Sequence, residues 1–147
     1  MLEGIKFVAA LSATLFAGAS IYINLVEHPS RLGLETSIAA TQWAPSYQRA
    51  TWMQAPLALV GFATGVAAWL LDAGRLWLVA ALLIGSVVPF TFVVIMPTNR
   101  ALLAPGRDLA SEDTRDLLVR WGRLHGVRSV LSLVSSLLFM VLLGRVA

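Results

Sequence analysis

The stretch FVAALSATLFAGASIYINLV, residues 7–26, contains no charged residue and decides the class of fold. An α-helix needs about 20 mostly apolar residues to cross the hydrocarbon core of a bilayer. Further uncharged runs follow at Met53–Leu71, Leu76–Met96 and, somewhat shorter, Ser129–Leu143. The sequence therefore predicts an all-α integral membrane protein with four transmembrane helices.

The composition of the whole chain agrees with lipid surroundings. Of the 147 residues, 58% are hydrophobic and 13% are charged, whereas roughly a quarter of the residues in a soluble domain are charged. No cysteine is present, which excludes disulfides, thiolate metal sites and cysteine nucleophiles. The net charge of +3 comes from basic residues in several connections, so we expect contact with anionic lipid head groups and no binding of nucleic acid.

We expect a single transmembrane domain over residues 1–147, folded as a four-helix bundle with up-and-down connectivity. The expected helices lie at about 5–28, 51–71, 76–96 and 112–143. Pro29 is expected to end the first helix near His28, because the residue before a proline disfavours helical geometry. The segment from there to Arg49 is expected to be a polar connection.

Aromatic and small residues indicate how the second helix sits. Trp43, Tyr47 and Trp52 lie near its start, where aromatic side chains usually anchor a span at the membrane interface. Gly61 and Gly65 stand four positions apart, a spacing that lets helix backbones approach closely in lipid. This approach serves packing either within the bundle or between the protomers of a homo-oligomer.

The basic residues predict an orientation in the membrane. The first and third connections, with the helix ends beside them, carry eight arginines, against three basic residues at the termini and in the second connection. Cytoplasmic loops carry an excess of Lys and Arg. We therefore expect the first and third connections in the cytoplasm and both termini outside, in a bacterial inner membrane.

Polar side chains gather at one end of the predicted bundle. Asn24, Glu27 and His28 stand at positions i, i+3 and i+4 near the end of the first helix, so they share one helix face. Gln54 opens the second helix and Asn99 follows the third. In an up-and-down bundle these helix ends meet at the same membrane face.

The start of the fourth helix adds a polar stripe at that end. Trp121, His125 and Arg128 are spaced i, i+4 and i+7 and lie on one face. Ionisable groups in membrane segments are costly, and they usually face the bundle interior and pair with one another, so we expect Arg128 to pair with Glu27. Together these groups predict a pocket for a small, largely apolar or aromatic molecule with oxygen functions.

Three short motifs mark the ends of successive helices: NLVEHP at 24–29, MPTN at 96–99 and WGRLHGVR at 121–128. They resemble the anthrone oxygenase-like family of small four-helix membrane proteins, which is largely grouped under a domain of unknown function. The resemblance implies oxidation of an anthrone to an anthraquinone by molecular oxygen, without a metal or flavin. It implies site roles for the matched residues Asn24, Glu27, Asn99, Trp121, His125 and Arg128.

A mechanism can be written for these residue types. Removing the acidic proton between the rings of an anthrone gives an electron-rich anion that can pass an electron to oxygen. A catalyst then needs a base, a donor for the oxyanion and an apolar slot for the rings. In this hypothesis His125 is the base, oriented by Glu27 or Asn99. Arg128 stabilises the oxyanion, and Trp121 stacks on the rings. The remaining polar residues at this end are expected to bind the substrate: Asn24, His28 and Gln54.

Two alternatives stay open at this point. In the first, the polar cluster binds a small molecule or a partner subunit without catalysing a reaction. In the second, the protein is a metal- or haem-dependent membrane redox protein. His28 and His125 would then ligate a haem, or a metal ion together with Glu27.

Overall fold

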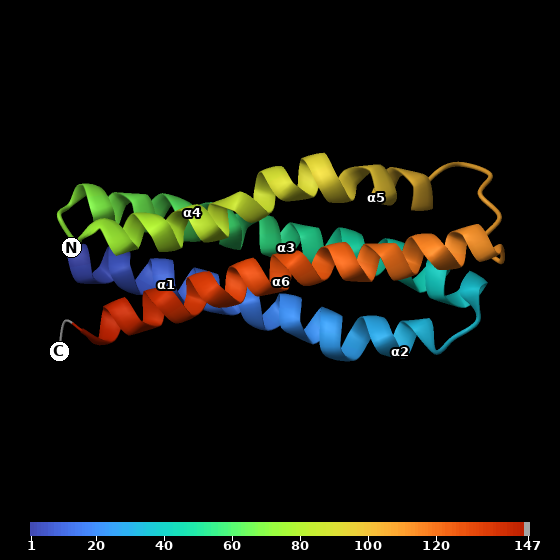
Figure 1. The fold of residues 1–147 in the computed structure, drawn as a ribbon, viewed down its shortest axis with the longest axis horizontal. Helices are drawn as coiled ribbons and strands as arrows, with labels where there is room; N and C mark the ends of the chain where they lie inside the picture. The colour runs from blue at the N-terminus through green and yellow to red at the C-terminus, as the bar shows by residue number, and fades with distance from the viewer. Residues whose placement is uncertain (146–147) are drawn as a thin grey trace.

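The computed structural model describes residues 1–145 and shows four long helices packed side by side (Figure 1). Within these residues, four helices are long and apolar enough to cross a membrane: Leu2–Leu32, Thr36–Leu70, Arg75–Leu102 and Glu112–Gly144. This confirms the predicted fold class, and the chain is an integral membrane protein.

The spans are built from the following elements: α1 (Leu2–Tyr22), the π-helical segment η1 (Ile23–Glu27) and α2 (His28–Leu32); α3 (Thr36–Leu70); α4 (Arg75–Phe90), the π-helical segment η2 (Thr91–Ile95) and α5 (Met96–Leu102); and α6 (Glu112–Gly144). Both α1 and α4 pack against α3 and α6. The four spans therefore follow the perimeter of the bundle in chain order. The α2–α3 and α5–α6 connections lie at one end, opposite the start of α1 (Figure 1).

Pro29 does not end the first span, contrary to the prediction, and the third span likewise passes through Pro97. The first span continues past His28 to Leu32, and the third continues past Met96 to Leu102. A proline lacks an N–H and its ring clashes with the carbonyl four residues earlier. For Pro29 and Pro97 that carbonyl lies inside η1 and η2, respectively.

The π-helical turns explain how the helices tolerate these prolines. The N–H of His28 bonds to the carbonyl of Ile23, and the N–H of Met96 bonds to the carbonyl of Thr91. Each of these hydrogen bonds spans five residues instead of four, which widens the turn locally. The wider turn takes up the mismatch that each proline creates, so the helix bends around the site instead of stopping.

The second span also begins much earlier than expected. Residues 29–49 do not form a polar connection, because α3 starts at Thr36 and contains Pro45 and Pro56. Burial explains the early start. Ala39 and Trp43 pack into an apolar cluster with Ile23, Leu118 and Trp121. The expected role of Trp43 as an interfacial anchor is wrong, since only 1% of its surface is exposed.

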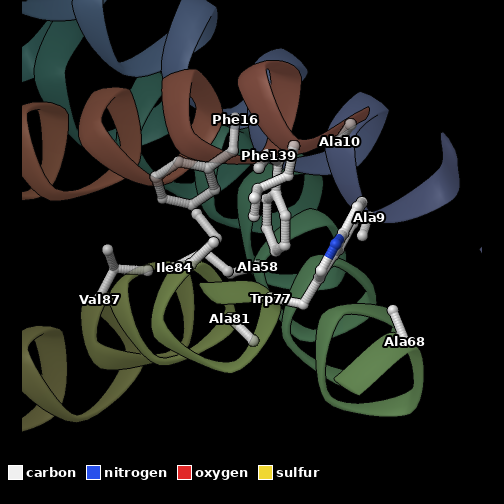
Figure 2. Packing of buried hydrophobic residues seen from close by; sticks show 13 residues of the cluster. Ala9, Ala10, Phe16, Ala58, Ala68, Trp77, Ala81, Ile84, Val87 and Phe139 are labelled. Carbon is white, nitrogen blue, oxygen red and sulfur yellow. The ribbon is translucent and has the colours of Figure 1, made fainter. Parts of the chain in front are cut away.

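The main apolar core lies toward the end that holds the start of α1. Figure 2 shows Phe16, Trp77, Ile84 and Phe139 meeting there, surrounded by alanines. The helices approach so closely that a Cβ at Gly65 would lie 2.7 Å from the Phe139 ring. Small side chains thus bring the helix backbones close together in this part of the bundle.

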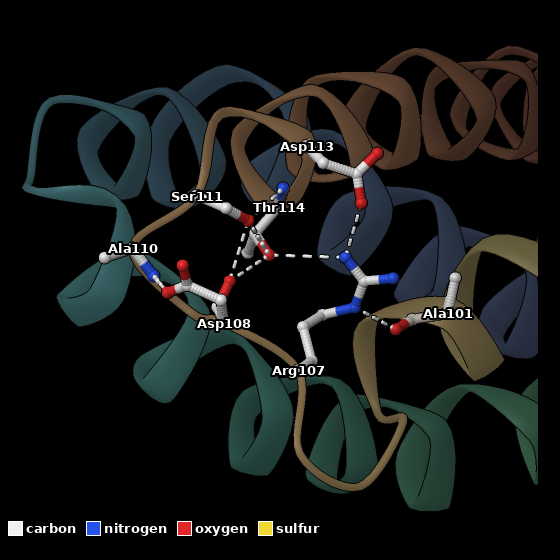
Figure 3. A network of polar contacts seen from close by, with 7 residues as sticks. All are labelled: Ala101, Arg107, Asp108, Ala110, Ser111, Asp113 and Thr114. Carbon is white, nitrogen blue, oxygen red and sulfur yellow. Dashed lines mark hydrogen bonds and ion pairs between the residues drawn. The ribbon is translucent and has the colours of Figure 1, made fainter.

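The long α5–α6 connection is held in place by a polar network (Figure 3). Arg107 donates to the carbonyl of Ala101 and, over 2.6 Å, to Asp113. Ser111 caps α6 by accepting from the N–H of Thr114. The connection is thereby tied to both helices that it joins, which positions the start of α6.

Candidate active site

Asn24, on η1, joins the first span to the last. Its Nδ2 donates to the carbonyl of Gly122 over 2.9 Å. Because a carbonyl can only accept, this contact fixes the orientation of the amide. The Asn24 Oδ1 then accepts from His125 Nδ1 over 2.6 Å and from Ser129 Oγ over 2.5 Å.

This network determines which nitrogen of His125 carries the proton. Since Asn24 Oδ1 is an acceptor, the Nδ1 of His125 must be protonated, and Nε2 of the neutral ring keeps a free lone pair. Among the residues that the structure describes, Nε2 has no hydrogen-bond partner, and the ring is 2% exposed. The prediction that Glu27 or Asn99 orients His125 is wrong, because Asn24 makes this contact.

The π-helical turn separates residues that were expected to share a face. Asn24 faces α6, whereas Glu27 faces α3 and accepts hydrogen bonds from Arg31 and Ser46. A wider turn rotates each residue through a smaller angle than an α-helix does. The predicted pair between Glu27 and Arg128 is therefore wrong, and the ion-pair partner of Glu27 is Arg31.

His28 adopts the tautomer opposite to that of His125. Its Nε2 donates to the carbonyl of Leu118 over 2.9 Å, and its Nδ1 accepts from Arg31 over 3.0 Å. The ring lies directly against the backbone of α6, since a Cβ added at Gly122 would be 2.5 Å from its Cδ2. His28 thus has no free ring nitrogen and locks the first span onto the last.

Trp121 contacts both histidines. The centroid of its indole ring lies 5.0 Å from that of His28 and 4.8 Å from that of His125, on which it stacks at 29°. Trp43 meets the same indole edge-on. Trp121 therefore supports the imidazole of His125, in addition to any contact with a substrate.

The residues present do not fit a metal or haem held by the two histidines. Both nitrogens of His28 are occupied, and Nδ1 of His125 is bonded to Asn24. The indole of Trp121 also contacts both rings. Across residues 1–145, no group of three or more His, Asp or Glu side chains is arranged to hold a metal ion.

Arg128 has no carboxylate partner within residues 1–145. Its Nη2 donates to Gln54 Oε1 over 2.9 Å, its Nε is buried without a partner among the described residues, and its guanidinium carbon lies 5.4 Å from the centre of the Phe16 ring. A cation inside a membrane span is costly unless something neutralises it. This arginine can therefore stabilise negative charge on a ligand.

Gln54 and Asn99 differ in how they take part. Gln54 is 1% exposed and connects Arg128 to Ser20. Asn99 is equally buried, but neither polar atom of its amide has a partner in the described part of the chain. The structure thus brings Gln54 into the network of Arg128 and leaves the side chain of Asn99 without a hydrogen-bond partner among residues 1–145.

A small cavity of about 10 Å³ lies beside His125, about the space that one water molecule needs. Trp121, Arg128 and Gln54 line it together with Tyr47 and Ser46. Sequence reasoning missed these last two residues because it placed them in a connection. The helical spacing of Trp43, Tyr47 and Gln54 was the available signal.

Comparison with known proteins identifies the family of this chain. The sequence model of the anthrone oxygenase family matches residues 43–138, which include Gln54, Asn99, Trp121, His125 and Arg128. The chain belongs to the anthrone oxygenase family. The predicted resemblance is thereby confirmed, and the protein is an oxygenase-like enzyme.

Individual relatives are fungal. The chain is 29% identical to the anthrone oxygenase of Claviceps purpurea over 150 residues, which cover 92% of this chain and 86% of that protein. It is 35% identical to the anthrone oxygenase ptaC of Pestalotiopsis fici over 117 residues, covering 69% and 82% respectively. A shorter match, 44% over 64 residues, is to the anthrone oxygenase tpcL of Aspergillus fumigatus, with 42% and 40% covered. No solved structure matches the chain.

Proposed function

We propose that this protein oxidises an anthrone-type polycyclic substrate to the quinone with molecular oxygen, and that its own side chains suffice for the reaction without a metal or flavin. The observation that carries the proposal is the state of His125. Asn24 holds the proton on Nδ1, so Nε2 is free to act as a base in a cavity shared with Arg128. The names of the fungal relatives support the choice of substrate.

The first step is removal of a proton from the methylene carbon between the rings. His125 Nε2 accepts this proton, and the Asn24 oxygen stabilises the resulting imidazolium through Nδ1–H. The electron pair spreads onto the carbonyl oxygen across the middle ring. Arg128, whose Nε lacks a protein partner among the described residues, donates to that oxygen and stabilises its charge.

The anion then reacts with oxygen. It transfers one electron to O₂, and the two radicals combine to form a carbon–oxygen bond. His125 returns its proton to the outer oxygen, giving a hydroperoxide on the substrate. Loss of the second methylene proton and cleavage of the O–O bond release water and leave a carbonyl. In sum, the methylene loses two hydrogens and gains one oxygen atom, and the other oxygen atom leaves as water.

The test is turnover of an anthrone by the purified protein in lipid nanodiscs. We expect one O₂ consumed per quinone formed, one labelled oxygen in the quinone when ¹⁸O₂ is supplied, and the same rate after treatment with a chelator. His125→Phe keeps a ring against Trp121 but removes the base, so turnover should fall about a hundredfold or more. His28→Ala should mainly lower the stability of the protein, and its loss of turnover should be smaller than that of His125→Phe.

Other outcomes would favour the alternatives. Turnover that stops with a chelator and returns with a metal ion would indicate a metal-dependent enzyme. Binding of the anthrone without consumption of O₂ would indicate a binding protein. Full activity in His125→Phe would remove this residue from the mechanism.

We also propose that the end holding the α2–α3 and α5–α6 connections faces the cytoplasm, as the excess of arginines there suggests. The chain has no cysteine, so single cysteines can be labelled cleanly. In intact cells, an impermeant thiol reagent should label Arg75→Cys but neither Glu35→Cys nor Leu109→Cys. Labelling of the last two alone would reverse the orientation.

A further inference from the structure

Three neighbouring spaces, each sharing lining residues with the next, lie between the outer side of α3 and α4 and His125. The outermost is a groove of about 410 Å³ beside Leu59, Phe62 and Gly85. It shares Ala58 and Val88 with a deeper space of about 90 Å³, which we call the α3–α4 slot. That slot in turn shares Tyr47, Thr51 and Arg128 with the cavity beside His125. The two proposed catalytic residues thus lie at the inner end of a path that begins on a lipid-facing side of the bundle.

The α3–α4 slot has apolar walls and one charged group. Its lining includes Phe16, Val87, Phe92 and Met96, and Arg128 is its charged residue. Phe16 is also part of the apolar core in Figure 2, so the α1 side of the slot is fixed by packing.

The threonines of the slot do not make it polar. The hydroxyl of Thr51 donates to the carbonyl of Tyr47, and the hydroxyl of Thr91 donates to the carbonyl of Val87. Both hydroxyls are therefore satisfied by their own helices. The slot offers a ligand apolar contact along its length and a cation at one end.

A second groove also reaches the cavity, but its chemistry differs. It lies between α3 and the α1–η1 segment, measures about 500 Å³, and shares Ile23, Ser46 and Ala50 with the cavity. Its lining includes Glu27 and Arg49. These two charged side chains favour water and ions over an aromatic ring system in their part of the groove, because apolar surface gains most by leaving water for apolar surroundings.

We propose that the substrate reaches the active site from the bilayer between α3 and α4, and that its rings bind in the α3–α4 slot with an oxygen at Arg128 and the reacting carbon toward His125. This inference rests on the proposed function and specifies the substrate class. The ligand is a flat, uncharged aromatic ring system that dissolves in lipid and carries oxygen at one end.

The slot must widen to hold such a ring system, since ligand sites typically measure about 300–1,000 Å³. The slot can widen most easily by a displacement of α4. Pro89 lies inside α4 and has no N–H for the carbonyl of Gly85, and η2 follows directly after. The regular hydrogen bonding of the helix is thus already interrupted beside the slot.

Three matched substitutions by leucine test the path. Ala55 is exposed and lines the slot, and Ala19 lines the second groove, between α3 and the α1–η1 segment. Ala63 is exposed on α3 and lines neither space. None of them belongs to the proposed catalytic residues. We expect Ala55→Leu to lower kcat/KM for the anthrone about tenfold or more, mainly through KM. Ala19→Leu and Ala63→Leu should stay within about twofold of the parent.

Binding of anthraquinone separates this inference from the proposed reaction, because it needs no turnover. Anthraquinone should bind the parent and His125→Phe in nanodiscs, and should bind Ala55→Leu about tenfold more weakly. If anthraquinone binds in this pattern but the parent does not turn over an anthrone, the binding site in the slot is supported while the proposed function fails. If binding and turnover fell only in Ala19→Leu, the path would lie in the other groove and the inference would be overturned. Equal binding and turnover in all three leucine variants would also overturn it.

Discussion

Replacing Asn24 with leucine should move a proton within the site and leave the bundle folded. Leucine is close in size to asparagine but offers no acceptor to His125. Without that acceptor, the ring can carry its proton on Nε2 and accept hydrogen bonds at Nδ1. The nitrogen that faces the substrate would then no longer be a base, so Asn24→Leu should reduce turnover about as strongly as loss of the base itself, roughly a hundredfold.

The cost in stability follows from what each partner of Asn24 has left. Ser129 retains an acceptor in the carbonyl of His125 at 3.4 Å, and the carbonyl of Gly122 lies within α6, where it can accept a helical hydrogen bond. The Nδ1 of His125 alone loses its partner, and this holds whichever ring nitrogen carries the proton. An unpaired buried donor or acceptor costs about 1–3 kcal/mol, whereas hydrogen bonds between membrane helices average about 0.6 kcal/mol. We expect the free energy of unfolding to fall by about 2 kcal/mol.

The assay uses the fact that the chain has only two histidines. Protein labelled with ¹⁵N-histidine and studied by NMR in nanodiscs should show one neutral ring of each tautomer. His28 should carry its proton on Nε2 and His125 on Nδ1. In Asn24→Leu the signals of His125 alone should change, and oxygen uptake should fall in the same preparation.

A matched control exists on the same pair of helices. Thr14 and Ser136 also join α1 to α6, with 2.8 Å between their hydroxyl oxygens, but they lie outside the site. Thr14→Val should cost about 0.6 kcal/mol and leave both tautomers and turnover unchanged. The reasoning is refuted if both rings of the parent share one tautomer, or if Asn24→Leu retains full turnover.

Three further changes test other contacts. Gly122→Ala should lower the free energy of unfolding by about 1–3 kcal/mol, because the new Cβ would lie 2.5 Å from His28; an unchanged denaturation midpoint would mean that the ring moves at no cost. Glu27→Gln and Arg31→Gln should be coupled by about 1–2 kcal/mol in a double-mutant cycle, since the two side chains form an ion pair, and simple additivity would contradict this. Arg128→Met should keep the free energy of unfolding within about 1 kcal/mol of the parent, because no carboxylate in residues 1–145 depends on this arginine. Turnover should nevertheless fall about a hundredfold. Strong destabilisation would show a structural role instead.

The sequence was sufficient for the parts of this protein that depend on local pattern. An uncharged run such as Phe7–Val26 must be helical in lipid, whatever surrounds it, because its backbone polar groups find no other partners there. The stripe of Trp121, His125 and Arg128 was equally readable, because α6 is regular and helical spacing places these residues on one face. Family membership also followed from short motifs at helix ends.

The tertiary structure alone decided how the polar residues pair. Spacing placed Glu27 near Arg128, but the π-helical turn η1 rotates Glu27 toward α3, where Arg31 and Ser46 meet it. A widened turn depends on a proline and on packing against other helices, neither of which helical periodicity describes. The helical residues 36–49 were missed for a related reason, since their burial against the other spans outweighs the local effect of Pro45.

What the sequence by itself determined is thus the membrane, the four spans and the presence of a histidine and an arginine at one end of the bundle. What only the tertiary structure decided is the chemical state of that histidine. The acceptor for His125 comes from Asn24, 101 positions away in the chain. A contact between two helices that are distant in sequence depends on the rotation of each helix about its axis, and packing sets that rotation.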